Sequence, residues 1–427
     1  MSKTKIGDVT SYRVLVFTFI TLLLNFQIEQ RVTIVPYAEH LVVGIQTSIA
    51  IFALFHIKLK TNSYNIIILV TWAILLLWSL MTGLWSEFQI LTLQRTFFVF
   101  GLGLILLILV YSDNNPLKTF IRTNYILCYI GLFVSMYGLA VWFFGEIFTI
   151  NGQMFQIWDL GSFSLQQNIR GFYQGQSSAV RISSLFGNPN RFAIMLIYTL
   201  VSTTTLFSLR KLTYKKFIVF MMVQMIALFL TSSRAGIVFA LFAVALVLVF
   251  TKREIRTTPF KSIFILFSFI IISFAITINK DLFYSFFSTR SSLLAGREEA
   301  WAVGLEIFGS NPFHGLGFGV SSEVLNSMFN ITITLHNLYI ALLVELGIMG
   351  LLLFIFITFV AIFRGGGILL DYKVNSNLRK CIVSSLALIT ALTLYQFFEI
   401  ITLRYSFFGI YWVYLIGFVT ATIYRKD

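Results

Sequence analysis

The sequence predicts an all-α membrane protein: a polytopic helical bundle of about 12 transmembrane helices, with a partly helical extracytoplasmic loop region. Two observations carry this prediction. Hydrophobic residues make up 58% of the 427 residues and charged residues only 11%, a composition that soluble domains of this size do not have. The apolar residues gather in runs of about 20, the length that crosses about 30 Å of hydrocarbon. We therefore treat residues 1–427 as a single integral membrane domain.

The apolar runs follow one another along the whole chain. The first resembles a signal peptide because Lys3 and Lys5 precede it, but no small-x-small cleavage site follows, so we expect an uncleaved first helix. Farther along, Asn188-Pro189-Asn190 predicts a turn that begins a helix. The predicted spans are residues 11–28, 41–56, 64–84, 93–111, 120–144, 190–208, 214–231, 235–251, 260–279, 335–363, 380–399 and 405–424.

The net charge of +14 follows the predicted orientation of these helices. With the N-terminus in the cytoplasm, the inner side holds 21 of the 31 Lys and Arg with five acids, whereas the outer side holds ten basic and 12 acidic residues. An excess of Lys and Arg in cytoplasmic loops is a topology signal of membrane proteins. The charge therefore requires no nucleic-acid partner, and both termini are predicted to be cytoplasmic.

The outer cations carry a second signal. Nine of the ten are Arg, against eight of the 21 inside. A guanidinium group binds phosphate oxygens in a bidentate manner, whereas topology requires only positive charge. Five of the ten outer cations, four Arg and Lys280, lie in two long outer loops, residues 145–189 and 280–334. They predict an extracytoplasmic oxyanion site, with ordinary structural ion pairs as the alternative.

Arg297 and Arg234 are the arginines best placed to bind a phosphate. Arg297 and Trp301 share one face of a short predicted helix at the membrane surface, which would place the indole at headgroup depth. Arg234 follows two serines at the outer N-terminus of a helix, where free N–H groups and the helix dipole attract anions. The alternative for both is an interfacial or snorkelling side chain without a ligand.

His336 and Asn337 open a long apolar run. An imidazole takes or gives a proton near neutral pH, so His336 is a candidate general base, with a structural histidine at a helix end as the alternative. Gly315 and Gly317 belong to the run GLGFG, where glycines would let the backbone approach a ligand closely. No strand–helix unit surrounds them, so they do not form a dinucleotide fingerprint.

The acidic residues give weaker signals. Glu345 lies about 13 Å deeper than His336 along the predicted helix. A carboxylate within a span is a functional candidate, although a helix–helix hydrogen bond is the favoured interpretation. Asp159 is a weaker acid/base candidate. The sequence has no D-x-D or H-E-x-x-H motif, and Cys128 and Cys381 lie in apolar segments, so we predict no metal site and no cofactor.

Four short segments follow one another along the chain: FGNPN at 186–190, SSRAG at 232–236, GREEAW and NPFHGLGFG within 296–319, and LHNLYIALLVELGIMG at 335–350. In this order they resemble the O-antigen ligase and polymerase superfamily of bacterial inner-membrane proteins. The resemblance implies a metal-independent, GT-C-like glycosyltransferase in the bacterial cytoplasmic membrane. It also implies a donor saccharide on undecaprenyl diphosphate and an acceptor glycan or glycolipid at the outer face.

Matched residue by residue, the resemblance assigns the diphosphate-binding arginines to Arg234 and Arg297 and the essential histidine to His336. Asn188, Asn190 and Arg191 are further substrate-binding candidates beside the NPN turn, although Arg191 has no clear counterpart in the family pattern. Trp301, Gly315, Gly317 and Asn337 complete the predicted site.

Three functions remain open at this point. The modest outer loops favour a surface-polysaccharide polymerase for O-antigen, capsule or exopolysaccharide, for which a chain-length regulator protein is a candidate partner. The alternative within the superfamily is an O-antigen ligase that joins polysaccharide to lipid A–core. The alternative of another class is a polysaccharide transporter or flippase, which usually places charges at the membrane midplane rather than at the outer edge.

Overall fold

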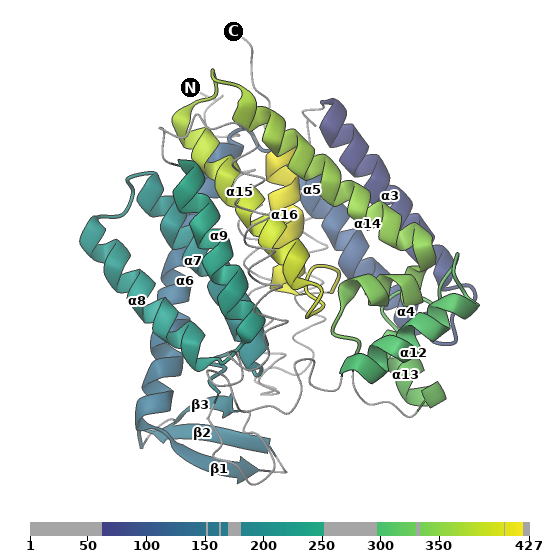
Figure 1. Cartoon of the computed structure of the whole chain (residues 1–427), viewed down its shortest axis with the longest axis horizontal. Coiled ribbons are helices and arrows are strands. Elements are labelled where there is room, and N and C mark those ends of the chain that lie inside the picture. Colours follow the sequence, from purple (N-terminus) through teal and green to yellow (C-terminus); the bar gives the residue numbers. More distant parts are fainter. Residues whose placement is uncertain are drawn as a thin grey trace, which may run out of the picture.

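The computed structural model describes residues 62–150, 153–161, 164–169, 181–251, 297–329, 334–404 and 406–421, and it is mainly helical (Figure 1). Seven of the described helices are long and apolar enough to cross a membrane. The predicted class of a polytopic helical membrane protein is therefore confirmed. The elements are α3 (Ser63–Thr82), α4 (Gln89–Thr96), the π-helical turn η1 (Phe97–Gly101), α5 (Leu102–Tyr111), α6 (Pro116–Phe144), β1 (Glu146–Ile150), β2 (Gln153–Asp159), β3 (Ser164–Ile169), α7 (Pro189–Ser208), α8 (Tyr214–Leu230), α9 (Arg234–Thr251), α12 (Arg297–Ser310), α13 (Ser321–Phe329), α14 (Leu338–Leu370), α15 (Ser376–Tyr395) and α16 (Phe407–Ala421).

Nine of the 12 predicted spans coincide with described helices, and α4, η1 and α5 together form one of them. The predicted spans 11–28, 41–56 and 260–279 lie outside the described residues. The closely spaced pair α8 and α9 is real: the turn between them places Ser232 at φ +49°, in the left-handed region. That single residue reverses the chain, which is why so short a polar interruption separates two helices.

Asparagine caps mark where many of these helices begin. Asn115 precedes Pro116 at the start of α6, and its side chain accepts from Lys118 N at 3.1 Å. Asn188 precedes Pro189 in the same way at the start of α7. An N-cap side chain satisfies a free N–H group, and proline at the first helical position loses no hydrogen bond. The Asn-Pro pairs therefore fix the starts of two spanning helices.

The first long loop contains a feature that the sequence did not predict. β1, β2 and β3 form an antiparallel sheet in which Glu146 pairs with Ile157 and Asp159 with Ser164. Two buried glutamines seat this sheet on the end of α6. Gln156 donates to Trp142 O at 3.0 Å, and Gln167 to Gly138 O at 3.2 Å. The second long loop is partly helical, as predicted, through α12 and α13.

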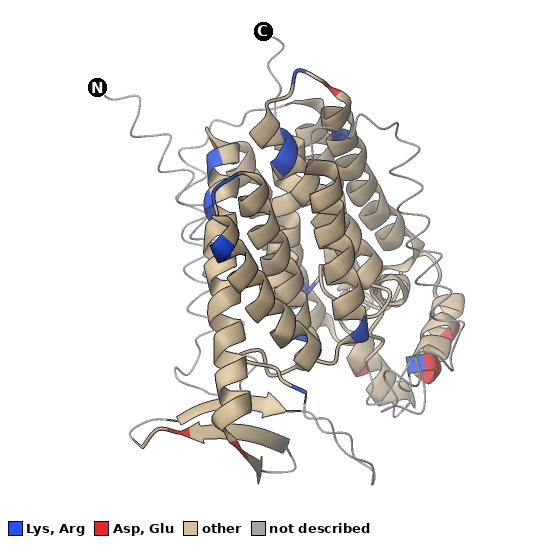
Figure 2. Ribbon diagram, turned by 60° about the vertical axis from the view of Figure 1, so that its left-hand side comes forward, with Lys and Arg blue, Asp and Glu red and all other residues tan. Residues whose placement is uncertain are grey.

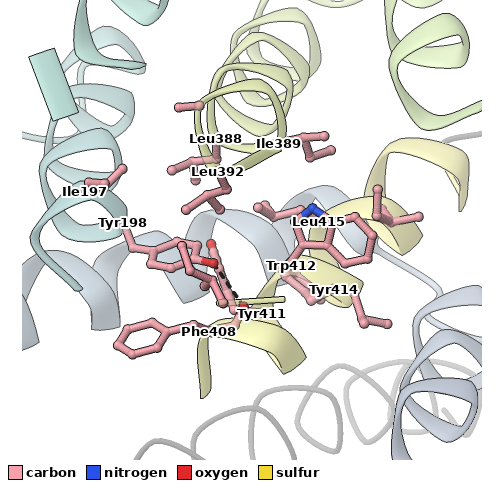
Figure 3. Close-up of a cluster of buried hydrophobic side chains, with 14 of the residues drawn as sticks. Ile197, Tyr198, Leu388, Ile389, Leu392, Phe408, Tyr411, Trp412, Tyr414 and Leu415 are labelled. Carbon is pink, nitrogen blue, oxygen red and sulfur yellow. Dashed lines mark hydrogen bonds between the residues drawn. The ribbon is translucent and has the colours of Figure 1, made fainter. Parts of the chain in front are cut away.

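α7 and α16 form the centre of the bundle. Every residue of α16 is buried, as is nearly all of α7, so both are enclosed by other helices. Figure 3 shows how α7, α15 and α16 meet: Tyr198 lies between the leucines of α15 and the aromatic residues of α16, and its hydroxyl donates to Phe408 O at 2.9 Å. A helix that is apolar all round requires such a position.

The two ends of the bundle differ in charge. Lys and Arg gather at one end, and Asp and Glu lie mostly at the other, beside the sheet and α12–α13 (Figure 2). We call these the basic end and the sheet end. The described basic end carries Asp113 and Asp371 as its acids, and its cations are Lys118, Arg122, Arg210, Lys211, Lys215, Lys216, Arg364, Lys373, Arg379 and Lys380.

Candidate active site

The candidate site lies at the sheet end, where α15 ends. The four residues after α15, Gln396 to Glu399, form what we call the α15 terminal turn. α7, α9, α12 and α14 all begin at this end of the bundle (Figure 1). The first N–H of α14, on Leu338, donates to Gln396 O at 2.9 Å. Helix N-termini carry partial positive charge, so their convergence favours an anion here.

His336 contacts the carboxylate of Glu399. Its Nδ1 lies 2.7 Å from Glu399 Oε1, and the side chains are 28% and 15% exposed, respectively. His336 itself has φ +47°, a left-handed conformation that costs a non-glycine residue about 1–3 kcal/mol. Such strain persists where the surroundings fix a residue, and here Asn337 caps α14 directly after it, accepting from Tyr339 N and Ile340 N.

Glu399 is held in its ionised form. Burial alone would raise the pKa of this carboxyl group. The hydrogen bond and charge of His336, together with the charges of Arg297 and Arg191, outweigh burial and hold the pKa below its ordinary value near 4.5. An ionised carboxylate only accepts hydrogen bonds, so Nδ1 of His336 carries the proton and donates. Nε2 is then the ring atom able to accept a proton from a substrate.

Arg297 lies at the same turn. As the first residue of α12, it donates from its guanidinium group to Phe398 O at 2.7 Å. This bond uses one of five N–H donors, and the side chain remains partly exposed. Arg297 therefore has donors left for a ligand.

The first turn of α9 approaches from another side. Ser233 accepts from Gly236 N at 3.4 Å, which caps the helix, and it also hydrogen-bonds to Tyr395, one turn before Glu399. Arg234 follows Ser233 directly and is partly exposed. The three residues predicted to be catalytic, Arg234, Arg297 and His336, are thus brought to one end of the bundle around one turn.

The NPN segment completes this arrangement. Asn190 donates to Glu399 Oε2 at 3.4 Å and accepts from Arg181 at 2.9 Å, while Arg181 also donates to Thr231 O at 2.8 Å. Asn188 caps α7 by accepting from Asn190 N. Arg191 is exposed, and its charge acts on Glu399. Of the predicted binding residues here, Asn190 and Arg191 thus reach the site, whereas the side chain of Asn188 serves the helix start.

Trp301 and the glycines lie in the structure as packing groups. The indole N–H of Trp301 donates to Leu335 O at 2.6 Å, one residue before His336. A Cβ on Gly315 would lie 2.5 Å from the backbone of Glu345, and one on Gly317 would lie 2.3 Å from Ser86 Oγ. The close approach that these glycines permit is therefore to protein, where α14 breaks at Gly347 with φ +66°.

The two weaker acidic candidates also have defined places. Glu345 is buried and accepts from Ser321 Oγ at 2.6 Å and Arg404 at 3.2 Å. It therefore joins α14 to α13 and to the chain before α16, in line with the structural interpretation. Asp159 ends β2 on the sheet, where it accepts from Gly161 N at 2.8 Å.

The arrangement combines an anion site with a proton acceptor. Arginines lie around His336, and Glu399 holds its Nδ1, which leaves Nε2 for a substrate. This is the pattern of a general base beside a charged leaving group. Within the described residues, no group of three or more His, Cys, Asp and Glu could hold a metal ion. The imidazole, carboxylate and guanidinium groups at the α15 terminal turn are suited to acid–base and electrostatic catalysis.

Comparison with known proteins agrees with this chemistry. Residues 217–355 match the family model described as O-Antigen ligase. This segment, about a third of the chain, supports a relationship to the O-antigen ligase and polymerase superfamily. A search of curated proteins found no match.

The matched family indicates glycosyl transfer of the ligase or polymerase type, on lipid-linked glycans in a membrane. The matched residues include Arg234, Arg297 and His336, while Asn190 and Glu399 lie outside them. The structure therefore adds two groups to those within the matched residues: the carboxylate of Glu399 from the α15 terminal turn and the amide of Asn190 from α7.

Glu399 is the residue that our sequence reasoning missed. It ends the predicted span 380–399, and the rule that singled out Glu345, that a carboxylate within a span is a functional candidate, applies to it equally. Arg181 lies in the predicted outer loop 145–189, and the sequence assigns it no role of its own. Its burial, at 4% exposed, and its two hydrogen bonds now make it a support for Asn190.

Proposed function

We propose that this protein is a surface-polysaccharide polymerase. It transfers a saccharide en bloc from undecaprenyl diphosphate to an acceptor glycan at the outer face of the bacterial cytoplasmic membrane. The observation that carries the proposal is the His336–Glu399 pair, 2.7 Å apart, at a helix end surrounded by arginines. The basic end of the bundle then faces the cytoplasm, in accord with the distribution of Lys and Arg.

The reaction follows from these positions. The acceptor hydroxyl gives its proton to Nε2 of His336 as its oxygen bonds to the anomeric carbon. The bond from that carbon to the diphosphate oxygen breaks, and undecaprenyl diphosphate leaves with the electron pair. Arg234 and Arg297 bind the diphosphate and offset its growing charge, with Arg191 at the exposed edge. Glu399 stabilises the protonated imidazole until the proton passes to water.

A transfer assay with purified protein in detergent tests the proposal. The donor is the lipid-linked repeat unit of the producing organism, and the readout is product length. His336→Ala should lower the rate by about 100–10,000-fold, the usual contribution of a general base. Arg297→Ala should abolish product as well. The matched control is His314→Ala, because His314 is an exposed histidine of the same end that packs against Trp85.

The products also decide between the alternatives. A ladder of lengthening chains is expected of a polymerase, whereas a single transfer to lipid A–core would identify a ligase. Because the detergent assay has no membrane gradient, a transporter would give no product. Wild-type rates from His336→Ala or Arg297→Ala would refute the assigned roles.

A further inference from the structure

A cavity lies on the sheet, apart from the candidate active site at the α15 terminal turn. Its volume is about 690 Å³, within the range of about 300–1,000 Å³ that small-molecule sites occupy. It is formed where α6 ends and the sheet begins. Its lining residues are Phe144, Glu146, Phe148, Ile157, Trp158, Asp159, Gly161 and Ser164.

The register of the sheet explains how polar groups gather there. Glu146 pairs with Ile157, and Asp159 pairs with Ser164, so these four side chains point to the same face. The opposite face carries Gln156 and its neighbours, which seat the sheet on α6. The carboxylates therefore project away from the bundle, and both are exposed.

Aromatic rings form the other part of the lining, from both sides of the sheet. Phe148 lies on the face of the carboxylates, whereas Trp158 alternates with Ile157 and Asp159 and lies on the face toward α6. Phe144 and Trp158 lie 4.9 Å apart between ring centroids and are tilted by 32°. Phe144 is 65% exposed and Phe148 44%, so ring surface is available to a ligand. Exposed rings beside carboxylates are unusual for a surface that contacts only water, because apolar rings gain by being covered.

These two kinds of group together match a saccharide. A pyranose ring presents apolar C–H faces, which stack on aromatic rings, and a rim of hydroxyl donors. Carboxylates accept hydrogen bonds without donating, so Glu146 and Asp159 suit that rim. Among the described lining residues none is Lys or Arg, so these residues offer no cation to a phosphate or uronate. This is the reverse of the arginine-rich site around Glu399.

The sheet is also joined to the candidate active site. Two hydrogen bonds join the chain before α7 to β3. Ser184 N donates to Gln167 Oε1 at 3.1 Å, and Ser183 Oγ donates to Asn168 O. These serines precede the NPN segment that contacts Glu399. The sheet and the α15 terminal turn thus lie at the same end of the bundle (Figure 1).

We propose that this sheet cavity binds an uncharged saccharide segment of the glycan substrate, away from the bond that reacts. The inference rests on the proposed function for the identity of the glycan. Binding of the saccharide can be measured at equilibrium without the transfer reaction, because the lining residues of the cavity take no part in transfer. For a polymerase, such a site would retain the growing chain between additions.

Binding to the protein in nanodiscs tests the inference. The probe is a lipid-free oligosaccharide of two to four repeat units, cut from the surface polysaccharide of the producing organism, with affinity measured by microscale thermophoresis. The double variant Glu146→Gln/Asp159→Asn keeps side-chain shape and should raise Kd at least tenfold, about 1.4 kcal/mol. Trp158→Ala should have an effect of the same size. Salt should change Kd of the wild type little, because the contacts pair no charges.

Two control variants separate the cavity from its surroundings. Glu298→Gln removes an exposed carboxylate on α12 at the same end, and Phe143→Ala removes a ring that is 66% exposed but does not line the cavity. Both should bind as the wild type does. Unchanged affinity in the double variant and in Trp158→Ala, or a steep loss of affinity with salt, would overturn the inference.

The competing occupant is the bilayer itself, since aromatic residues also gather at membrane interfaces. Brominated lipid quenches tryptophans that lie in the bilayer, and the difference between wild type and Trp158→Phe isolates the Trp158 signal. Protection of Trp158 is expected, whereas strong quenching would assign this surface to lipid. His336→Ala should bind the probe as the wild type does. The binding assay therefore tests the sheet cavity, and the transfer assay tests the proposed function, independently of each other.

Discussion

Replacing Glu399 by Gln changes one charge at the centre of the candidate active site and little else. The amide oxygen still accepts from Nδ1 of His336, which lies 2.7 Å from the carboxylate in the wild type. The imidazole therefore keeps its tautomer and its place. What is lost is the negative charge that stabilises the ring once it has taken a proton.

The size of the effect follows from that contact. A hydrogen bond to a charged group contributes about 1.5–3 kcal/mol, which corresponds to about a 10–150-fold fall in kcat. Removing His336 altogether should cost about 100–10,000-fold. Because Glu399 acts through His336, the double variant Glu399→Gln/His336→Ala should be no slower than His336→Ala alone.

The detergent transfer assay measures this effect as separate kcat and KM values. Loss of one negative charge beside Arg297 and Arg191 should leave the KM for the diphosphate donor unchanged or lower, while kcat falls. Glu323→Gln is the matched control: this carboxylate binds Arg95 at 2.7 Å, and its pKa, which burial would raise, is held low by that arginine. It should retain kcat within about threefold, the scale of a half-exposed ion pair. A Glu399→Gln enzyme with normal kcat, or additive losses in the double variant, would refute the reasoning.

Three further outcomes are expected. Acidification should erase the stability difference between wild type and Glu399→Gln. Because the pKa of Glu399 is lowered, its contribution is present above about pH 4.5, and the gap in Tm should narrow as the pH falls below about 4.5 and through the folded pKa. Trp301→Phe removes the indole bond to Leu335 O and should lower kcat about threefold to tenfold at normal expression, since a neutral hydrogen bond contributes about 0.5–1.5 kcal/mol. Gly347→Ala should destabilise the protein by about 1–3 kcal/mol in thermal melts, because φ is +66° and the new Cβ would meet backbone at 2.4 Å, whereas Gly366→Ala in the same helix meets nothing within 4 Å and should be neutral or stabilising.

The helical bundle is predictable because its signals are local. A run of about 20 apolar residues and an Asn-Pro cap each act within a few residues, so the starts of α6 and α7 agree with the sequence to within a few positions. The sheet could not be predicted because its strands do not alternate regularly between apolar and polar residues, the local pattern that indicates a strand. They carry Gln and Ser at several of these positions. Gln156 and Gln167 can be buried because carbonyl groups of α6 accept hydrogen bonds from them. These are tertiary contacts between separate segments of the chain, so no local sequence pattern reports them.

The candidate site was predictable in part for the same reason. Arg234, Arg297 and His336 stand in short motifs that a single chain displays. The partner of His336 does not: Glu399 is 63 residues away, and no local pattern links them. The glycines show the converse limit. Sequence indicates that backbone approaches something closely at Gly315, but only the fold reveals that the neighbour is α14 rather than a ligand.

The charge at the α15 terminal turn gives an independent reason to expect an anionic substrate. Glu399 is one negative charge, whereas Arg181, Arg191 and Arg297 all act on this small region, and α9 begins there with Arg234. Four helix N-termini add further positive potential. Like charges held together raise the free energy of the folded state unless a counter-charge is bound. A bound diphosphate would add negative charge beside these arginines, which is why donor binding should stabilise the wild type more than any acceptor sugar does.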